Sequence, residues 1–259
     1  MPRDFTNVLW LLKLGAVVNL YFLSNAGLFA LDAADAYVVV PAAILFAVNA
    51  YRCLFPVRYE HNVVFHDSVF SSILVTRMLA TFSEVAYIFL FSYVLRLLNT
   101  GRAGWVDFVS WLMVAQVVVS QGFVWSAILT ERFELYVYEE SGWFLIFAAN
   151  TIASAYLYWT TAQSGSRGVL LVLNMLFGVL YLPWQVMHMN SLRANARENR
   201  AAAAPIEWST GLGRALREKN RRTDADAWGG FIGLTWMTAY WATLIPMWTY
   251  YIVRVLGPR

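Results

Sequence analysis

The sequence predicts an all-α membrane protein in which seven transmembrane helices form one bundle. Three features of the composition predict this class: 59% of the 259 residues are hydrophobic, only 14% are charged, and the mean hydropathy is +0.52. A soluble domain of this length usually has about a quarter of its residues charged. The low charge content therefore indicates a chain that lies largely in lipid.

Seven segments are long and apolar enough to be membrane spans. A span needs about 20 mostly apolar residues, and its backbone must satisfy its own hydrogen bonds in lipid, so each segment is expected to be a helix. Pro41, Pro183 and Pro246 lie within three of them and are expected to mark kinks. The expected spans are 8–30, 37–55, 68–97, 105–129, 140–161, 168–189 and 228–255.

The segment 190–227 is the one long hydrophilic connection, and we expect it to be a loop with a short helix near 212–219. Eight Lys and Arg residues lie in it. Basic residues concentrate on the cytoplasmic side of membrane proteins, which places this loop and the N-terminus inside and the C-terminus on the opposite side. The basic loop could instead bind acidic lipids or a partner protein.

Residues 1–259 are thus expected to form a single integral membrane domain with a long basic cytoplasmic loop. Multi-pass proteins of this kind occur in the bacterial inner membrane and in the endoplasmic reticulum, and both locations fit the sequence.

Two ionisable side chains, Arg77 and Glu84, interrupt the third apolar segment. A charge at mid-bilayer costs about 2.5 kcal/mol or more, so each is expected to face the bundle interior. They share a helix face but lie about 10 Å apart along the axis, so we expect each to pair with another helix. A carboxylic acid that stays protonated in an apolar pocket can donate a proton in acid catalysis. The alternative is a polar contact that only holds helices together.

More polar residues gather at the cytoplasmic ends of the expected spans. Asp67 precedes span three, Glu139 and Glu140 open span five, and His188 ends span six. Acidic residues at a helix start also stabilise the helix macrodipole, which is the structural alternative for the two glutamates. Spacings of three and four residues place polar and aromatic positions on one helix face. These positions are Asn174, Tyr181, Gln185 and His188 in span six, and Glu139, Trp143 and Asn150 in span five.

Aromatic residues in span seven lie too deep for an interfacial belt. Trp236, Tyr240 and Trp241, with Tyr181 and Trp143, could line a pocket for an apolar ligand and stabilise a cation. Ordinary packing is the alternative.

Several chemistries are not supported by the motifs. The single cysteine, Cys53, excludes a cysteine metal cluster, and His61 and His66 are five residues apart, a poor spacing for shared ligation on a helix. The last span has no lysine for a retinal Schiff base. No phosphate-binding loop, GxSxG or acidic prenyl-diphosphate motif is present. We therefore expect no metal, no cofactor and no nucleic-acid partner.

Three functions compete. The first is a membrane enzyme that isomerises or cyclises an isoprenoid, sterol-like or other lipid substrate by general acid–base chemistry. In size the chain is similar to small seven-helix terpene cyclases and to membrane sterol isomerases, but no motif of either family is present. Glu84 would donate the proton, Arg77 would position or polarise the substrate, and the aromatic residues Trp236, Tyr240 and Trp241 would stabilise a cation.

The second function is non-enzymatic: a transporter, a receptor or an accessory subunit with a membrane-protein partner. The third is a lipid transferase or hydrolase at the cytoplasmic interface. In every case the bilayer is a partner, and both enzyme hypotheses add a hydrophobic small molecule. The candidate catalytic residues are Glu84, Arg77, Glu139, Asp67 and His188, and the candidate substrate-binding residues are Trp143, Asn150, Asn174, Tyr181, Gln185, Trp236, Tyr240 and Trp241.

Overall fold

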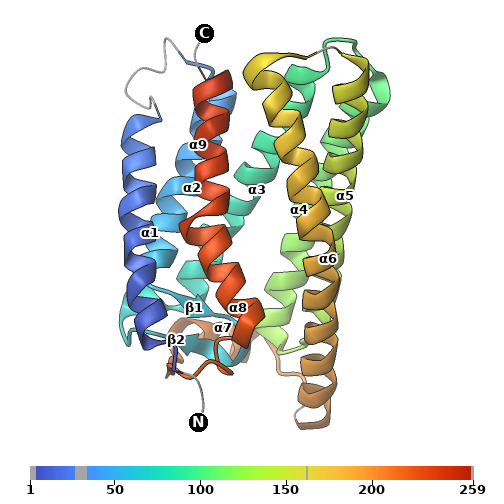
Figure 1. Cartoon of the computed structure of the whole chain (residues 1–259). Coiled ribbons are helices and arrows are strands. Elements are labelled where there is room, and N and C mark those ends of the chain that lie inside the picture. The colour runs from blue at the N-terminus through green and yellow to red at the C-terminus, as the bar shows by residue number, and fades with distance from the viewer. Residues whose placement is uncertain (1–3, 27–33, 162, 203, 258–259) are drawn as a thin grey trace. The chain divides into compact units, whose positions relative to one another are not determined.

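The computed structural model describes residues 4–26, 34–161, 163–202 and 204–257, and it is mostly helical (81%; Figure 1). Five of its helices are long and apolar enough to cross a membrane. The prediction of a helical membrane protein is confirmed at this level. The count of seven spans and the sides of the two termini stay predictions, and 27–30, the end of the first expected span, lies outside the described residues. The five helices are α1 (Thr6–Asn25), α2 (Ala36–Leu54), α3 (Ile73–Leu98), α4 (Gly104–Thr130) and α6 (Gly165–Ala202).

The other two expected spans differ from this group. The segment 140–161 corresponds to α5 (Glu134–Thr160), which is 27 residues long but has three glutamates among its first seven residues and is not among the helices apolar enough to cross a membrane. The segment 228–255 is not one continuous α-helix. It is divided into α8 (Gly230–Trp236), a π-helix (Met237–Ala242) and α9 (Leu244–Leu256).

Pro246 gives a physical reason for this interruption. It lies in the first turn of α9 and has no N–H to donate to the carbonyl of Ala242, where the π-helix ends. The α-helical hydrogen-bond ladder therefore lacks one bond at this point. The change to π geometry accommodates the break.

The chain forms two compact units: unit 1 comprises Met1–Ser83 and Ile206–Arg259, and unit 2 comprises Glu84–Pro205. The division falls within α3, so unit 1 contains the first turns of this helix and unit 2 the remainder.

In unit 1, α1 and α2 pack against the π-helix. The Asn19 side chain donates to the carbonyl of Trp241 at 2.8 Å, and the Asn49 side chain donates to the carbonyl of Tyr240 at 3.0 Å. A Cβ atom at Gly15 would lie 2.5 Å from that of Ala242, so only glycine permits this close approach. Both asparagines are fully buried, and their amides stabilise backbone groups that a regular helix would satisfy internally.

A small three-stranded sheet in unit 1 is the one β-sheet of the described residues, and it is absent from the all-α prediction. β1 (Val57–Arg58) pairs antiparallel with β2 (Val63–Val64), which pairs in parallel with β3 (Asn220–Arg221). Strands of two residues are too short to produce a periodic pattern, so sequence periodicity cannot predict them. Two 3₁₀ turns, η2 (Glu60–Asn62) and η3 (Val69–Ser71), complete the connection between α2 and α3.

The segment 190–227 is more ordered than the expected loop. Its first part continues α6 to Ala202, and its short helix, α7, spans Trp208–Arg217 rather than 212–219. The sequence 190–202 is rich in Ala, Arg and Asn, and Ala and Arg favour a helix. Low apolarity marks where a span leaves the lipid but does not mark where its helix ends.

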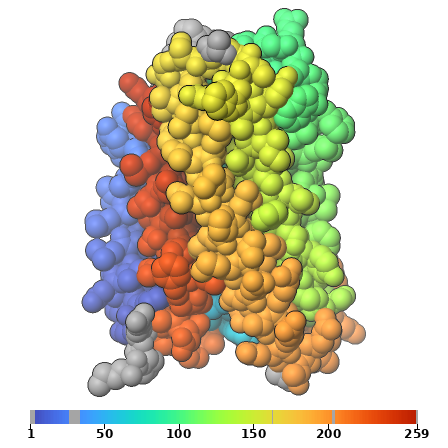
Figure 2. Space-filling view, turned by 45° about the vertical axis from the view of Figure 1, so that its right-hand side comes forward, coloured from blue at the N-terminus to red at the C-terminus, as the bar shows by residue number. Residues whose placement is uncertain are grey.

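Unit 2 contains the rest of α3 together with α4, α5 and α6. In Figure 2, α6 (yellow to orange) runs along the surface of this unit. The helices α5 and α6 approach closely at Gly178, where an added Cβ would overlap the side chain of Thr151. This close packing fixes how the polar residues of the two helices meet.

Candidate functional site

Glu84 meets a polar partner on a different helix of unit 2, as expected. The Gln121 side chain of α4 donates to Glu84 Oε2 at 3.1 Å, and Glu84 and Gln121 are 3% and 6% exposed. A hydrogen bond from an amide to a buried carboxyl satisfies part of its bonding capacity. The contact fits both a site role and a structural role for Glu84.

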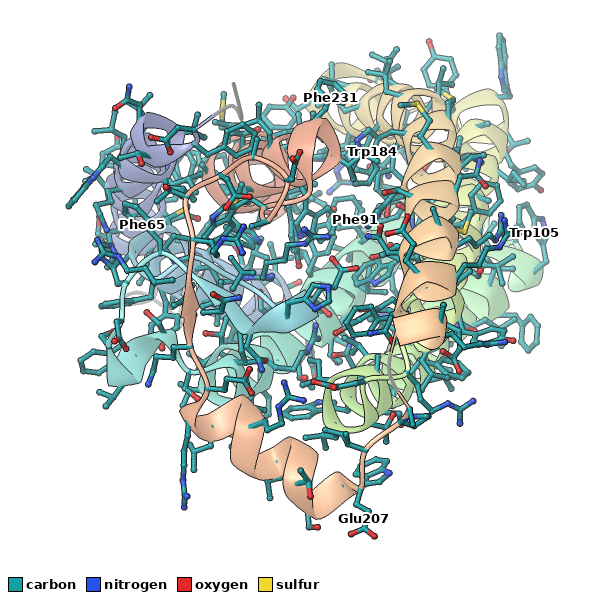
Figure 3. All side chains as sticks on the ribbon, turned by 90° about the horizontal axis from the view of Figure 1, so that it is seen from below. Phe65, Phe91, Trp105, Trp184, Glu207 and Phe231 are labelled. Carbon is teal, nitrogen blue, oxygen red and sulfur yellow. The ribbon has the colours of Figure 1, made fainter. Side chains whose placement is uncertain are left out.

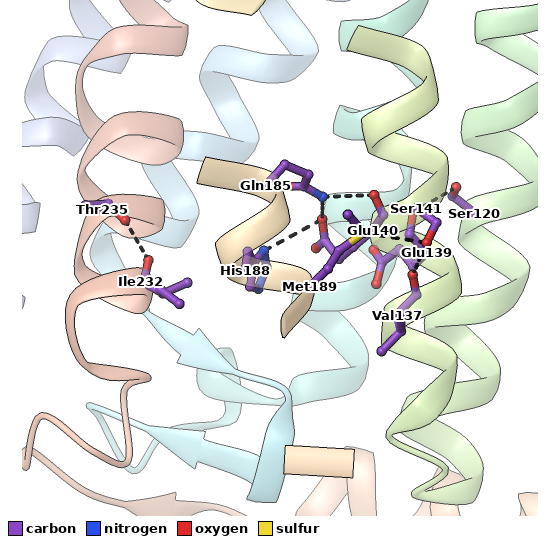
Figure 4. Close-up of polar contacts among 10 residues, drawn as sticks. All are labelled: Ser120, Val137, Glu139, Glu140, Ser141, Gln185, His188, Met189, Ile232 and Thr235. Carbon is purple, nitrogen blue, oxygen red and sulfur yellow. Dashed lines mark hydrogen bonds and ion pairs between the residues drawn. The ribbon is translucent and has the colours of Figure 1, made fainter. Parts of the chain in front are cut away.

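A second buried carboxyl group lies between α5 and α6 (Figure 4). The Gln185 side chain donates to Glu140 Oε2 at 2.5 Å and to the Glu140 carbonyl at 2.9 Å. His188 Nδ1 lies 3.8 Å from the same carboxylate oxygen. Glu140 and Gln185 are buried, and the His188 side chain is only 16% exposed. We call Glu140, Gln185 and His188 the acid–base cluster.

The helical spacing explains why these side chains meet. Gln185 and His188 are three residues apart and therefore share a face of α6. Glu140 lies in the second turn of α5. The adjacent Glu139 is also buried, and its carbonyl accepts a hydrogen bond from Ser120 at 3.4 Å. Gln185, His188 and Glu139 are among the site residues that the sequence predicts. Spacing favours Glu139 of the two adjacent glutamates, whereas the side chain that meets Gln185 and His188 is that of Glu140.

Aromatic rings continue from this cluster along α5 and α6. His188 contacts the Trp184 ring at a centroid distance of 5.1 Å, and Trp184 contacts Tyr181 at 5.8 Å. Tyr181 in turn contacts Phe147 at 4.6 Å, and Phe147 stacks with the predicted residue Trp143 at 6.2 Å. Rings packed at these distances provide an apolar surface with π faces directly beside an imidazole.

Two predicted polar residues, Asn150 and Asn174, lie deeper in unit 2. The Asn174 side chain donates to Ser154 Oγ at 3.0 Å. Asn150 is fully buried, and within the part of the chain that the structure describes neither its side-chain nitrogen nor its oxygen has a hydrogen-bond partner. Because such groups are uncommon in native proteins, Asn150 is a position where a polar ligand group or water would be stabilised.

The remaining candidates lie in unit 1. Arg77 is 1% exposed, and its guanidinium carbon lies 5.4 Å from the centroid of the Tyr59 ring. Asp67 is exposed in the connection between α2 and α3. Trp236 and Tyr240 contact each other at 4.7 Å. Trp241 is buried, and the guanidinium of Arg52 lies over its ring at 4.5 Å.

Arg52 was not among the predicted site residues. It is 3% exposed, and its guanidinium also lies 5.7 Å from the centroid of the Tyr240 ring. The sequence placed it at the end of a span, where a basic residue is an ordinary topology signal. Its aromatic partners are some 190 residues away in sequence, so spacing could not reveal the contact.

A further polar contact in unit 1 joins Lys13 and His66. Lys13 Nζ lies 2.8 Å from His66 Nε2 and donates to the Leu54 carbonyl at 2.9 Å. Because an ammonium group can only donate, the contact assigns His66 Nε2 as the acceptor. Partial burial, then the positive charges of Lys13 and Arg221, lower the pKa of His66 below its usual value.

The described residues contain no group of three or more His, Cys, Asp or Glu side chains that could hold a metal ion. Comparison with known proteins identifies no relative, because no family model, curated protein or solved structure matches the chain.

Proposed function

We propose that the chain is an integral-membrane enzyme that performs general acid–base chemistry on a hydrophobic substrate. Glu140 and His188 are the two groups that would exchange protons with it. The observation that carries this proposal is the acid–base cluster, in which a buried carboxyl group and an imidazole lie side by side. Imidazole and carboxyl groups are the side chains that most often act as general acids and bases in enzymes.

The contacts within the cluster support different roles for its members. Gln185 donates twice to Glu140, once to the carboxylate and once to the backbone, and so fixes its position. The 3.8 Å separation between His188 Nδ1 and Glu140 Oε2 exceeds a hydrogen bond. The two groups are therefore close neighbours that are not hydrogen-bonded through this pair of atoms, while Gln185 is a positioning residue.

Double-bond isomerisation is the reaction that fits such a pair best. One group removes a proton from the carbon next to a double bond, and the double bond moves by one position. The other group then delivers a proton to the far carbon. The substrate loses one proton and gains one, so the reaction needs no oxidant, reductant or co-reactant.

The aromatic surface beside His188 supports an isoprenoid or sterol-like substrate. Trp184 packs against His188, and Tyr181 packs against both Trp184 and Phe147. Their π faces would also stabilise positive charge that develops when a double bond is protonated. The same acid could start a cyclisation, for which Glu84 is a second candidate donor.

Solvent deuterium provides a test that does not require the substrate to be known. Membranes that contain the protein are incubated in D₂O, and their lipids are compared by untargeted mass spectrometry. We expect at least one lipid to acquire deuterium only when the wild-type protein is present. Glu140→Gln and His188→Gln should each reduce this labelling about a hundredfold or more, because a positioned general acid or base typically contributes about 10²–10⁴-fold to the rate. Glu198→Gln removes an exposed carboxylate from the same helix α6 and should leave labelling unchanged.

The variants must elute as a single species in detergent size-exclusion chromatography, so that loss of labelling is not loss of folding. Full labelling by both cluster variants would refute the assignment to Glu140 and His188. If Glu84→Gln alone abolishes labelling, the acid is Glu84. Absence of protein-dependent labelling, together with a stoichiometric co-purified protein, would favour an accessory subunit.

A further inference from the structure

Helix α7 of unit 1 has an exposed apolar stripe. Trp208, Leu212 and Leu216 are spaced by four residues and are 56%, 47% and 45% exposed. Four-residue spacing places them along one side of the helix. Exposed rows of this kind are unusual outside lipid or a partner surface.

The adjacent side of α7 is attached to unit 1. Gly211 and Ala215 are buried, and Ser72 Oγ donates to the carbonyl of Ala215 at 3.2 Å. Ser72 follows the 3₁₀ turn η3, where Val69 and Phe70 are 74% and 56% exposed. Two segments joined by this hydrogen bond thus expose large apolar side chains. We call Val69, Phe70, Trp208, Leu212 and Leu216 the apolar patch.

The orientation of α7 differs from that of the long helices of unit 1. Figure 3, which is viewed from below, shows α7 from the side, starting next to the label of Glu207, while α1 and α9 are seen close to end-on. The helix therefore lies across the direction in which the spans of this unit run. A helix at the boundary of a membrane with its axis in the membrane plane has this arrangement.

The charges around α7 are mostly positive. Five basic residues and two acidic residues lie in 206–222. Arg214 is paired with Glu218 at 2.5 Å, and Arg222 with Asp224 at 2.7 Å. In the described part of the chain, Arg217, Lys219 and Arg221 make no ion pair, so their charges are available to an external anion.

We propose that α7 is an interfacial helix that binds an anionic lipid surface. The apolar patch would enter the boundary between headgroups and acyl chains, with Trp208 at the headgroup level. Arg217, Lys219 and Arg221 would contact the phosphates of acidic lipids. Helices that expose an apolar face beside basic residues bind membrane surfaces. In unit 1, α1 and α2 are long and apolar enough to cross the same bilayer.

Site-specific fluorescence in lipid nanodiscs tests the proposal with the full chain. The buried native cysteine is first removed by Cys53→Ala. In this background, a polarity-sensitive nitrobenzoxadiazole probe is attached to a new cysteine introduced by Leu212→Cys or by Thr210→Cys. Both positions are exposed, but Thr210 lies on the opposite side of the helix. Nanodiscs contain phosphatidylcholine alone or with 30% phosphatidylglycerol, and quenching by doxyl-labelled lipid is compared with quenching by iodide.

We expect doxyl lipid to quench the probe at 212 at least threefold more than the probe at 210, with the larger effect in the anionic discs. The double substitution Arg217→Gln and Lys219→Gln should remove the dependence on anionic lipid. Equal iodide quenching at both positions, without doxyl quenching, would overturn the proposal. Doxyl quenching that is the same in both lipid compositions would overturn the assignment to an anionic surface.

Discussion

His66 is the residue whose protonation should be visible in the stability of unit 1. Its pKa is lowered by partial burial and by Lys13 and Arg221, so between the folded and unfolded pKa values the unfolded chain binds more protons. Stability that is present above pH ~6.5 should therefore decrease as the pH falls through the folded pKa. We expect the thermal midpoint of the purified protein to be lower at pH 5.5 than at pH 7.5.

His66→Gln provides the matched control, because a glutamine oxygen can still accept from Lys13 but does not titrate in this range. This variant should lose most of the pH dependence between 7.5 and 5.5. The hydrogen bonds from Arg214 to Glu218 and from Arg222 to Asp224 lower the pKa of each carboxyl group. These two groups therefore change the stability of the protein only below pH ~4.5. An unchanged pH dependence in His66→Gln would contradict the assignment.

Individual polar residues were predicted with uneven success, for reasons of geometry. Periodicity places Gln185 and His188 on one face of a helix, and the structure has them on the same face. Periodicity cannot choose between Glu139 and Glu140, because adjacent residues differ by only about 100° around a helix. The partner of Glu84, Gln121, lies on another helix, and a contact between helices is not encoded in spacing along one of them.

At the scale of elements, the packing of α5 against α6 depends on Gly178. A Cβ atom there would overlap the Thr151 side chain, so we expect Gly178→Ala to separate the helices and to destabilise unit 2 by about 1–3 kcal/mol. The measurement is the thermal midpoint of the purified protein, taken from the fraction that still elutes as a single species in size-exclusion chromatography after heating. Loss of the acid–base cluster geometry should accompany the loss of stability.

Gly122 of α4 is the control for this substitution, because a Cβ added there has no neighbour within 4 Å. Gly122→Ala should be neutral or stabilising by up to about 1 kcal/mol. Combining Gly178→Ala with Thr151→Ala removes two of the overlapping atoms and should restore part of the stability. Equal stability of Gly178→Ala and Gly122→Ala would contradict the close approach of α5 and α6 at Gly178.

The elements themselves could be predicted where apolar runs are long and uninterrupted. Five helices of the structure correspond to expected spans. The break near Ala242 was not predicted, because a proline only marks a kink site and the sequence does not show whether the ladder becomes π-helical. The small sheet was missed because its strands have two residues each and β3 comes from a distant part of the chain.

At the scale of the whole molecule, the membrane topology of unit 2 depends on whether α5 crosses the bilayer. If α4, α5 and α6 all cross the bilayer, the turn at Gly101 and the end of α6 at Glu198 lie on opposite sides. If α5 does not cross, these two positions lie on the same side. Single-cysteine variants Gly101→Cys and Glu198→Cys in a Cys53→Ala background can be labelled with a membrane-impermeant maleimide in sealed vesicles.

We expect only Gly101→Cys to react in right-side-out vesicles and only Glu198→Cys in inverted ones, because the basic end of α6 is expected inside. Both exposed positions should react after detergent is added, which checks that labelling is limited by sidedness. Reaction of both positions in the same vesicles would exclude α5 as a span.

The length of α6 has a consequence for how the proposed enzyme obtains its protons. With 38 residues it is about 57 Å long, while the hydrocarbon layer is about 30 Å thick, so its last turns extend into water. His188 lies about 35 Å along the axis from Gly165. With Gly165 at one boundary of the hydrocarbon, the imidazole sits at the other boundary. Protons could then reach His188 directly from bulk water on that side of the membrane. The turnover rate would therefore depend on the pH of that one compartment.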